Sequence, residues 1–125
     1  VWRTATQRAT SNAVIHILMS LKDHQKQVDN WAHQFVKPYW EPLAQMARLA
    51  EETGEVARAM NHYHGEKKVK ESEGTPNLGQ ELTDVIFTVC CIANSNGIDL
   101  QKEWEEMMQK KHYGRDKNRF ERQPK

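Results

Sequence analysis

The sequence predicts an all-α protein of the four-helix-bundle type, and three observations support this prediction. Apolar side chains recur every three or four residues in four stretches, which is the spacing of one face of a helix. Proline, glycine and asparagine residues separate these stretches. The chain has 125 residues, which is the length of one domain with a modest core.

The first helix is expected over residues 21–36, followed by a break at Pro38. The residue before a proline is disfavoured in helical geometry, so the helix should end there. Pro42 suits the first turn of a second helix, which we expect to continue to about Tyr63. The inward side chains of the first helix are expected to be Val28, Trp31, Ala32 and Phe35.

A polar connection over residues 64–76 leads to a third helix, which we expect to begin after the N-cap Asn77 and to end near Ser95. Between Val85 and Ala93 this helix is apolar nearly all round. A helix of that kind is usually buried on several sides. In so short a chain it favours a central place in the bundle or an interface between subunits, so we expect at least a dimer.

Asn96 and Gly97 end the third helix, and Asp99 is expected to cap a fourth that continues to about Tyr113. Residues 1–18 are expected to be an N-terminal extension or an added segment, which leaves residues 19–125 as the domain. The inward side chains of the fourth helix are expected to be Trp104, Met107 and Met108.

Composition and charge argue against several classes of partner. The net charge of +1 gives no general attraction to nucleic acid. No apolar run approaches the roughly 20 residues of a membrane helix. Cys90 and Cys91 are neighbours on a helix and point in different directions, so a disulfide between them is not expected. We expect a cytoplasmic protein without nucleic-acid or membrane partners.

Two carboxylate groups lie beside the apolar stripes of the second and third helices. Glu51, Glu52 and Glu55 fall within an arc of roughly 100° on the second helix, and Glu81 and Asp84 share a face of the third. Like charges about 4 Å apart repel by about 4 kcal/mol at an effective dielectric near 20, so convergence requires protons or a cation. Hard oxygen ligands select Mg²⁺, Mn²⁺ or Ca²⁺. The alternative is a pair of solvated acidic faces.

The stripes themselves are expected to be buried where the two helices pack. Gly54 lies among the carboxylates, which indicates close approach of another backbone or a ligand, or else no role. The stripe of the second helix consists of Leu43, Met46, Leu49, Ala50, Val56 and Met60. The stripe of the third helix consists of Leu78, Leu82, Val85, Ile86, Val89 and Ile92.

Three further groups of residues have both a structural and a functional interpretation. The basic residues after the fourth helix form either a solvated tail or a phosphate clamp. His62 and His64 are expected on the surface rather than as zinc ligands. The aromatic residues of the first helix and the corner after it belong to the core, unless one of them stacks on a base. The basic group consists of Lys110, Lys111, Arg115, Lys117 and Arg119.

The acidic residues at 51, 52 and 55, followed by those at 81 and 84, resemble a known signature. It is the E-E-x-x-E … E-x-x-D pattern of the MazG-like, all-α nucleoside triphosphate pyrophosphohydrolases. Lys111 and Arg115 are similar to the basic ending of the same family. The resemblance covers roughly residues 24–122, nearly the whole domain.

This resemblance implies a helical bundle that works as a homodimer or homotetramer and needs Mg²⁺, with Mn²⁺ as a substitute. The implied reaction is hydrolysis of a nucleoside triphosphate, in particular a dNTP, to the monophosphate and pyrophosphate, in nucleotide pool control or sanitation. Related enzymes in this group are dUTPases, dCTP pyrophosphatases and phosphoribosyl-ATP pyrophosphohydrolases. Without the resemblance, a non-catalytic helical interaction module is the competing interpretation.

The resemblance also assigns residues to roles. Glu51 and Glu52 are the implied catalytic pair, with Glu51 as an additional ligand or as the residue that orients the attacking water. Lys111 and Arg115 are implied to hold the substrate phosphates. The implied metal ligands are Glu52, Glu55, Glu81 and Asp84.

Overall fold

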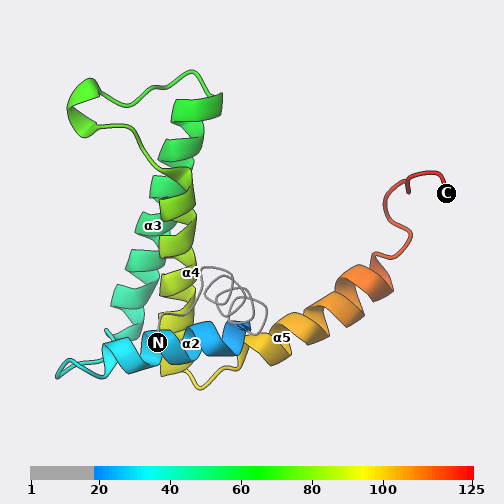
Figure 1. Ribbon diagram of the computed structural model, residues 1–125, viewed down its shortest axis with the longest axis horizontal. Helices are drawn as coiled ribbons and strands as arrows, with labels where there is room; N and C mark the ends of the chain where they lie inside the picture. Colours follow the sequence, from blue (N-terminus) through cyan, green and yellow to red (C-terminus); the bar gives the residue numbers. More distant parts are fainter. Residues whose placement is uncertain (1–18) are drawn as a thin grey trace, which may run out of the picture. The chain divides into compact units, whose positions relative to one another are not determined.

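A computed structural model describes residues 19–125, and all regular structure in this part of the chain is helical (Figure 1). The all-α prediction is therefore confirmed. The interpretation of residues 1–18 as an extension lies outside the described residues. The described chain forms two compact units, one of residues 19–26 with 99–125 and one of residues 27–98. No helix within residues 19–125 is both long and apolar enough to cross a membrane.

The larger unit is built on an antiparallel helix pair, α3 (Pro42–His64) and α4 (Leu78–Ser95), which lie side by side in Figure 1. Their bounds agree with the predicted ones to within about one residue. Pro42 lies at the start of α3, where its missing N–H costs no hydrogen bond. Asn77 caps α4, because its side chain accepts a hydrogen bond from the Gln80 N–H at 3.1 Å. The connection between the helices contains a single 3₁₀ turn over Glu71–Glu73.

The Asn77 cap can be tested for its contribution to the stability of α4. Asn77→Ala removes the acceptor for one otherwise unsatisfied N–H, and it should lower the free energy of unfolding by about 1 kcal/mol. Urea unfolding followed by circular dichroism at a fixed protein concentration measures this change. Asn77→Ser is the control, because serine caps helices about as well. Equal stability of the alanine and serine variants would contradict the capping role.

α2 (Leu21–Ala32) ends four residues earlier than predicted. The reason is a tightening of its last turn, where the Gln34 and Phe35 N–H groups bond to carbonyls only three residues back. Ala32 is buried as expected, but the predicted inward residues Trp31 and Phe35 are 49% and 52% exposed. Trp31 instead lies edge-on to Phe35, with ring centroids 5.0 Å apart.

The predicted burial of the apolar stripes is wrong for several positions. Leu43 on α3 is 85% exposed, and Ile86 on α4 is 51% exposed. The residues that α3 buries are Gln45, Glu52 and Ala59, spaced seven apart along one narrow face. Small and polar residues let the two helices approach closely, so the most exposed stripe residues lie beside the contact, while others such as Leu49 and Val89 are half-buried. The other exposed stripe residues include Met46, Met60 and Leu82.

The smaller unit contains the fourth predicted helix, α5 (Leu100–Met107), which continues as π-helical turns over Met108–Arg115. The Asp99 carboxylate caps α5 as predicted, accepting hydrogen bonds from the N–H groups of the second and third residues of the helix. Trp104 was expected to face inward, and this prediction is wrong because the ring is 52% exposed. Met107 and Met108 are half-buried.

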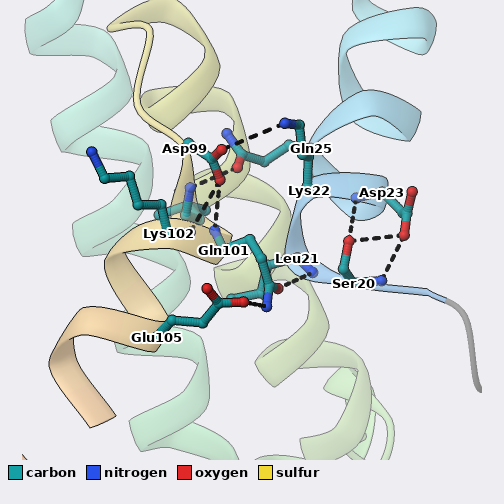
Figure 2. Close-up of polar contacts among 10 residues, drawn as sticks. Ser20, Leu21, Lys22, Asp23, Gln25, Asp99, Gln101, Lys102 and Glu105 are labelled. Atoms are coloured by element: carbon teal, nitrogen blue, oxygen red, sulfur yellow. Dashed lines mark hydrogen bonds and ion pairs between the residues drawn. The ribbon is translucent and has the colours of Figure 1, made fainter. Parts of the chain in front are cut away.

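The start of α2 belongs to the same unit and is fastened to the start of α5 (Figure 2). The Leu21 N–H donates to the Gln101 side chain at 3.1 Å, and the Leu100 N–H donates to the Gln25 side chain at 2.8 Å. The Lys22 ammonium lies 3.6 Å from the Asp99 carboxylate. Each glutamine thus satisfies a backbone donor at the first turn of the facing helix.

Candidate metal centre

Three carboxylates from two helices meet in the larger unit. Glu52 comes from α3, and Glu81 and Asp84 come from α4; one oxygen of each lies within 4.8 Å of the others. We call these three residues the carboxylate cluster. Glu52 is buried, Glu81 is half-buried and Asp84 is exposed, so the cluster opens to solvent on one side. Carboxylates this close repel one another strongly unless a cation neutralises them.

Local sequence explains why these three residues converge. Glu81 and Asp84 are three residues apart and therefore lie on one face of the first turns of α4. Glu52 lies in the middle of the narrow face that α3 buries, between Gln45 and Ala59. The antiparallel pairing brings the beginning of α4 alongside the second half of α3.

Arg48 partly neutralises the carboxylate cluster. It lies one turn before Glu52 on α3 and forms an ion pair with that buried carboxylate. Its other nitrogen is 3.2 Å from Glu51, whose side chain is 63% exposed. Three ionised carboxylates against one guanidinium leave two negative charges, which matches the charge of one divalent cation. Arg48 was not predicted as a partner of the cluster, although its spacing of four from Glu52 is a signal for an ion pair.

Glu51 and Glu55 are not part of the carboxylate cluster. The Glu55 carboxylate lies 3.2 Å from the Arg58 guanidinium, which also lies 2.7 Å from Glu73 of the 3₁₀ turn. The hydrogen bond to Glu73 raises the pKa of Arg58, so the guanidinium stays charged. The structure therefore brings together three of the five predicted acidic residues. The role of Glu55 as a metal ligand stays a prediction that requires this ion pair to exchange.

A cavity of about 650 Å³ adjoins the carboxylate cluster, with Glu52 and Asp84 in its wall. This volume is within the range of small-molecule sites. Most of the surface area of its wall is apolar, and five aromatic rings line it, so we call it the aromatic cavity. Its polar and charged lining includes Lys37, Gln45, Arg48, Thr88 and Cys91. Its aromatic and apolar lining consists of Trp31, Phe35, Pro38, Tyr39, Trp40 and Phe87.

Two partly buried sets of hydrogen bonds hold the aromatic corner of this cavity. The Tyr39 hydroxyl donates to Asp29 and accepts from the Asn94 amide at 3.0 Å. Burial, followed by the bond to Asp29, raises the pKa of Tyr39 to about 12, so this hydroxyl stays protonated at neutral pH. The Gln45 amide donates to the Trp40 carbonyl at 2.8 Å. Sequence analysis missed these supports, because Tyr39 and Asn94 are 55 residues apart in the chain.

The thiols of the larger unit are unpaired, as expected. Cys90 is buried and Cys91 is half-buried in the aromatic cavity wall, and neither forms a disulfide within the described chain. Burial raises the pKa of both thiols. Both therefore stay protonated and poorly nucleophilic at neutral pH.

The predicted phosphate clamp lies in the smaller unit. Lys111 and Arg115 are exposed in the π-helical turns, where bonding from residue i to i+5 still keeps residues four apart on one face. Arg115 forms an ion pair with its neighbour Asp116 at 3.2 Å, while Lys111 has no carboxylate within ion-pair distance among residues 19–125. The clamp interpretation stays a prediction.

Gly54 does not mark a close approach within the chain. A Cβ built at this position would meet nothing within 4 Å among the described residues. The predicted approach of a neighbouring backbone is therefore wrong for this structure. The open space beside Gly54 belongs instead to a second cavity on α3.

Comparisons with known proteins agree with the family that the sequence resembles. Residues 41–120 match the model of the MazG nucleotide pyrophosphohydrolase domain. The uncharacterized protein YpjD of Bacillus subtilis (strain 168) is 44% identical over 103 residues, covering 82% of this chain and 92% of that relative.

Two crystal structures are also similar. The Bacillus-conserved MazG protein, a nucleotide pyrophosphohydrolase, is 46% identical with a TM-score of 0.63, covering 74% of this chain and 88% of that chain. The structure of YPJD from Bacillus subtilis is 42% identical with a TM-score of 0.68, covering 78% of this chain and 97% of that chain.

Proposed function

This chain belongs to the MazG nucleotide pyrophosphohydrolase family, and from that premise we propose that it hydrolyses nucleoside triphosphates, in particular dNTPs, to monophosphate and pyrophosphate with Mg²⁺. The observation that carries the proposal is the carboxylate cluster opening beside the aromatic cavity. This arrangement supports the proposal, because three oxygen donors that could bind a cation lie next to a space that suits a planar base. A cytoplasmic role in nucleotide pool control is part of the proposal.

The donor set of the cluster fits Mg²⁺ better than softer metals. Its three oxygen donors, Glu52, Glu81 and Asp84, are hard ligands, and Mg²⁺ binds a few carboxylates together with substrate phosphates. Mn²⁺ has similar ligand preferences and would substitute. The chemistry that Mg²⁺ supplies when bound is neutralisation of phosphate charge and activation of water.

The protein residues contribute mainly positioning and charge. Arg48 holds the buried Glu52 carboxylate in place from one turn away. Glu51, exposed beside the same arginine, is suited to orient an attacking water. The rings of the aromatic cavity would stack on the base, and stacking tolerates different bases because each has a π-face. Lys111 and Arg115 would bind phosphate oxygens.

A product assay tests this proposal directly. The full chain is incubated with a panel of NTPs, dNTPs and phosphoribosyl-ATP, with Mg²⁺, with Mn²⁺ and with EDTA. We expect monophosphate and pyrophosphate in either metal and neither product in EDTA. Release of orthophosphate, or no hydrolysis of any nucleotide, would overturn the proposal. Hydrolysis of phosphoribosyl-ATP alone would assign the chain to a different reaction of the same class.

The exposed apolar stripes support the expected homodimer or homotetramer. Leu82 is 47% exposed and Ile86 is 51% exposed on the same face of α4. Sedimentation velocity at micromolar concentration should give the mass of a dimer or tetramer, because a second copy can remove these stripes from water. Ile86→Glu should reduce that mass. Val36→Glu, at an exposed valine outside the helices, should not. A monomeric parent chain would contradict the expectation.

The clamp assignment predicts a moderate kinetic effect. Lys111→Ala and Arg115→Ala should each lower kcat/KM roughly 10- to 150-fold, because each removes one charge-assisted contact to a phosphate. Steady-state kinetics measure this change. The Mg²⁺ affinity of the nucleotide-free protein, measured by titration, should be unchanged. Lys102→Ala, at an exposed lysine of α5 outside the basic group, is the control. Effects within twofold in both variants would show that the tail is solvated and not part of the site.

A further inference from the structure

A second cavity, of about 440 Å³, lies between the C-terminal half of α3 and the connection that follows it. We call it the basic cavity, because four cationic side chains and one carboxylate line it, which leaves three positive charges in excess. Its uncharged wall comes from Gly54, Ala57, Asn61 and Val69. Its charged lining consists of Arg58, Lys67, Lys68, Lys70 and Glu73.

The basic cavity lies on the opposite side of α3 from the carboxylate cluster. Its four α3 residues, from Gly54 to Asn61, lie between roughly 140° and 240° around the helix from Glu52. Glu52 points toward α4. A ligand in the basic cavity therefore cannot use the same face of α3 as a cation held by the cluster.

The segment that carries the lysines of the basic cavity is held against α3 at two points. The Lys68 ammonium donates to the His62 carbonyl at 2.6 Å, and the Val69 N–H donates to the His62 ring at 3.3 Å. At the far end, the Arg58 guanidinium lies 2.7 Å from the Glu73 carboxylate. These contacts fasten both ends of the lysine-bearing segment to one helix. His62 acts here as an anchor for the segment.

The charge in the basic cavity is not neutralised within the described chain. Arg58 is occupied by Glu55 and Glu73. Lys67 and Lys70, in contrast, have no carboxylate within ion-pair distance among residues 19–125. Ammonium groups are compact point charges with several donors each, and they commonly bind phosphate. The open space beside Gly54 leaves room for the anion against the helix.

From this geometry we propose that the basic cavity is a second binding site, for a polyphosphate anion, separate from the carboxylate cluster. Its ligand is free pyrophosphate or the phosphate chain of a nucleotide, which share the same recognition chemistry. When Glu55, which also pairs with Arg58, is counted, two positive charges remain in excess, and they match a multiply charged anion better than a single carboxylate. The volume of about 440 Å³ is large enough for a phosphate chain.

Calorimetric titration of the full chain in EDTA and low salt tests the proposal, because without divalent metal the carboxylate cluster repels anions. The probes are pyrophosphate, a dNTP, orthophosphate and a short RNA. We expect pyrophosphate or the dNTP to bind, and Lys67→Gln/Lys70→Gln to weaken that binding at least tenfold. Lys26→Gln/Lys102→Gln, which removes two exposed charges elsewhere, should change it less than twofold.

The arms of the experiment separate the outcomes. Pyrophosphate binding as tightly as the dNTP identifies free pyrophosphate as the ligand, and a tighter dNTP identifies a nucleotide; both support the proposal. Tighter binding of RNA, equal affinity for orthophosphate, or equal losses in site and control variants overturns it. Turnover with Mg²⁺ should persist in the Lys67→Gln/Lys70→Gln variant. Loss of turnover together with affinity would make the cavity part of the catalytic phosphate site and overturn its separateness.

Discussion

Glu52→Gln is expected to lower turnover at least a hundredfold while the helices stay folded. Loss of a residue that only supports a metal ligand costs about 10- to 100-fold, so loss of a ligand should cost the upper end of that range or more. Glutamine keeps the shape of the side chain and can still accept a hydrogen bond from Arg48. The substitution removes one of the three charges that attract the cation. Asp84→Asn should have a similar effect from the exposed side of the cluster.

Pyrophosphate release at saturating nucleotide, together with Mg²⁺ affinity by calorimetry, measures both variants. Glu71→Gln is the matched control, because it neutralises an exposed carboxylate in the same unit and outside the cluster. We expect full turnover in that control. A parent-like rate in either cluster variant would remove Glu52 or Asp84 from the metal site. A fall in turnover with unchanged Mg²⁺ affinity would instead give that carboxylate a role in the chemical step.

Trp31→Ala is expected to raise KM for the nucleotide roughly 5- to 150-fold with a smaller change in kcat. Stacking of one base on an aromatic ring is worth about 1–3 kcal/mol, and Trp31 lies in the wall of the aromatic cavity. The ring also contacts Phe87, with centroids 5.5 Å apart, so its removal opens the cavity on two sides. Because the base is remote from the phosphates, the loss should fall mainly on binding.

Trp104→Ala is the control for this prediction, because its ring is 52% exposed, close to the 49% of Trp31, and does not line the cavity. Nucleotide affinity should be unchanged in it. Steady-state kinetics with a purine and a pyrimidine substrate distinguish stacking, which affects both, from a shape effect on one of them. Equal KM values for Trp31→Ala and the parent chain would place the base elsewhere.

Helix positions were predictable because the signals that begin helices are local. Pro42, Asn77 and Asp99 each lie within a few residues of the groups they affect, and each begins a helix as predicted. Burial was less predictable. Periodicity identified stripes containing Leu43 and Ile86, but a stripe in the sequence does not tell which surface covers it. The contact of α3 and α4 uses a neighbouring face instead.

The carboxylate cluster was likewise predictable only in part. Spacing predicted that Glu81 and Asp84 share a face of α4, and the packing of α3 on α4 brings Glu52 to within 4.8 Å of both. Spacing did not distinguish Glu52 from Glu55, because the two lie on the same face of α3. Glu55 is held outside the cluster by Arg58, which also binds Glu73, fifteen residues away in the chain. The aromatic cavity was beyond sequence analysis for a related reason. Its rings come from separate segments, and its supports are contacts between residues distant in the chain.

The narrow contact between α3 and α4 has a calorimetric consequence. The buried apolar residues of the described chain are small, namely Val28, Ala32, Ala59, Cys90 and Ala93. Heat capacity rises on unfolding in proportion to the apolar surface that becomes hydrated, typically by about 12–15 cal/mol/K per residue. For a single copy of this chain, the heat-capacity change on unfolding should fall below that value. The free energy of unfolding of a single copy should therefore vary little with temperature. If the chain associates, any heat-capacity change above the single-copy value measures the apolar surface that association buries.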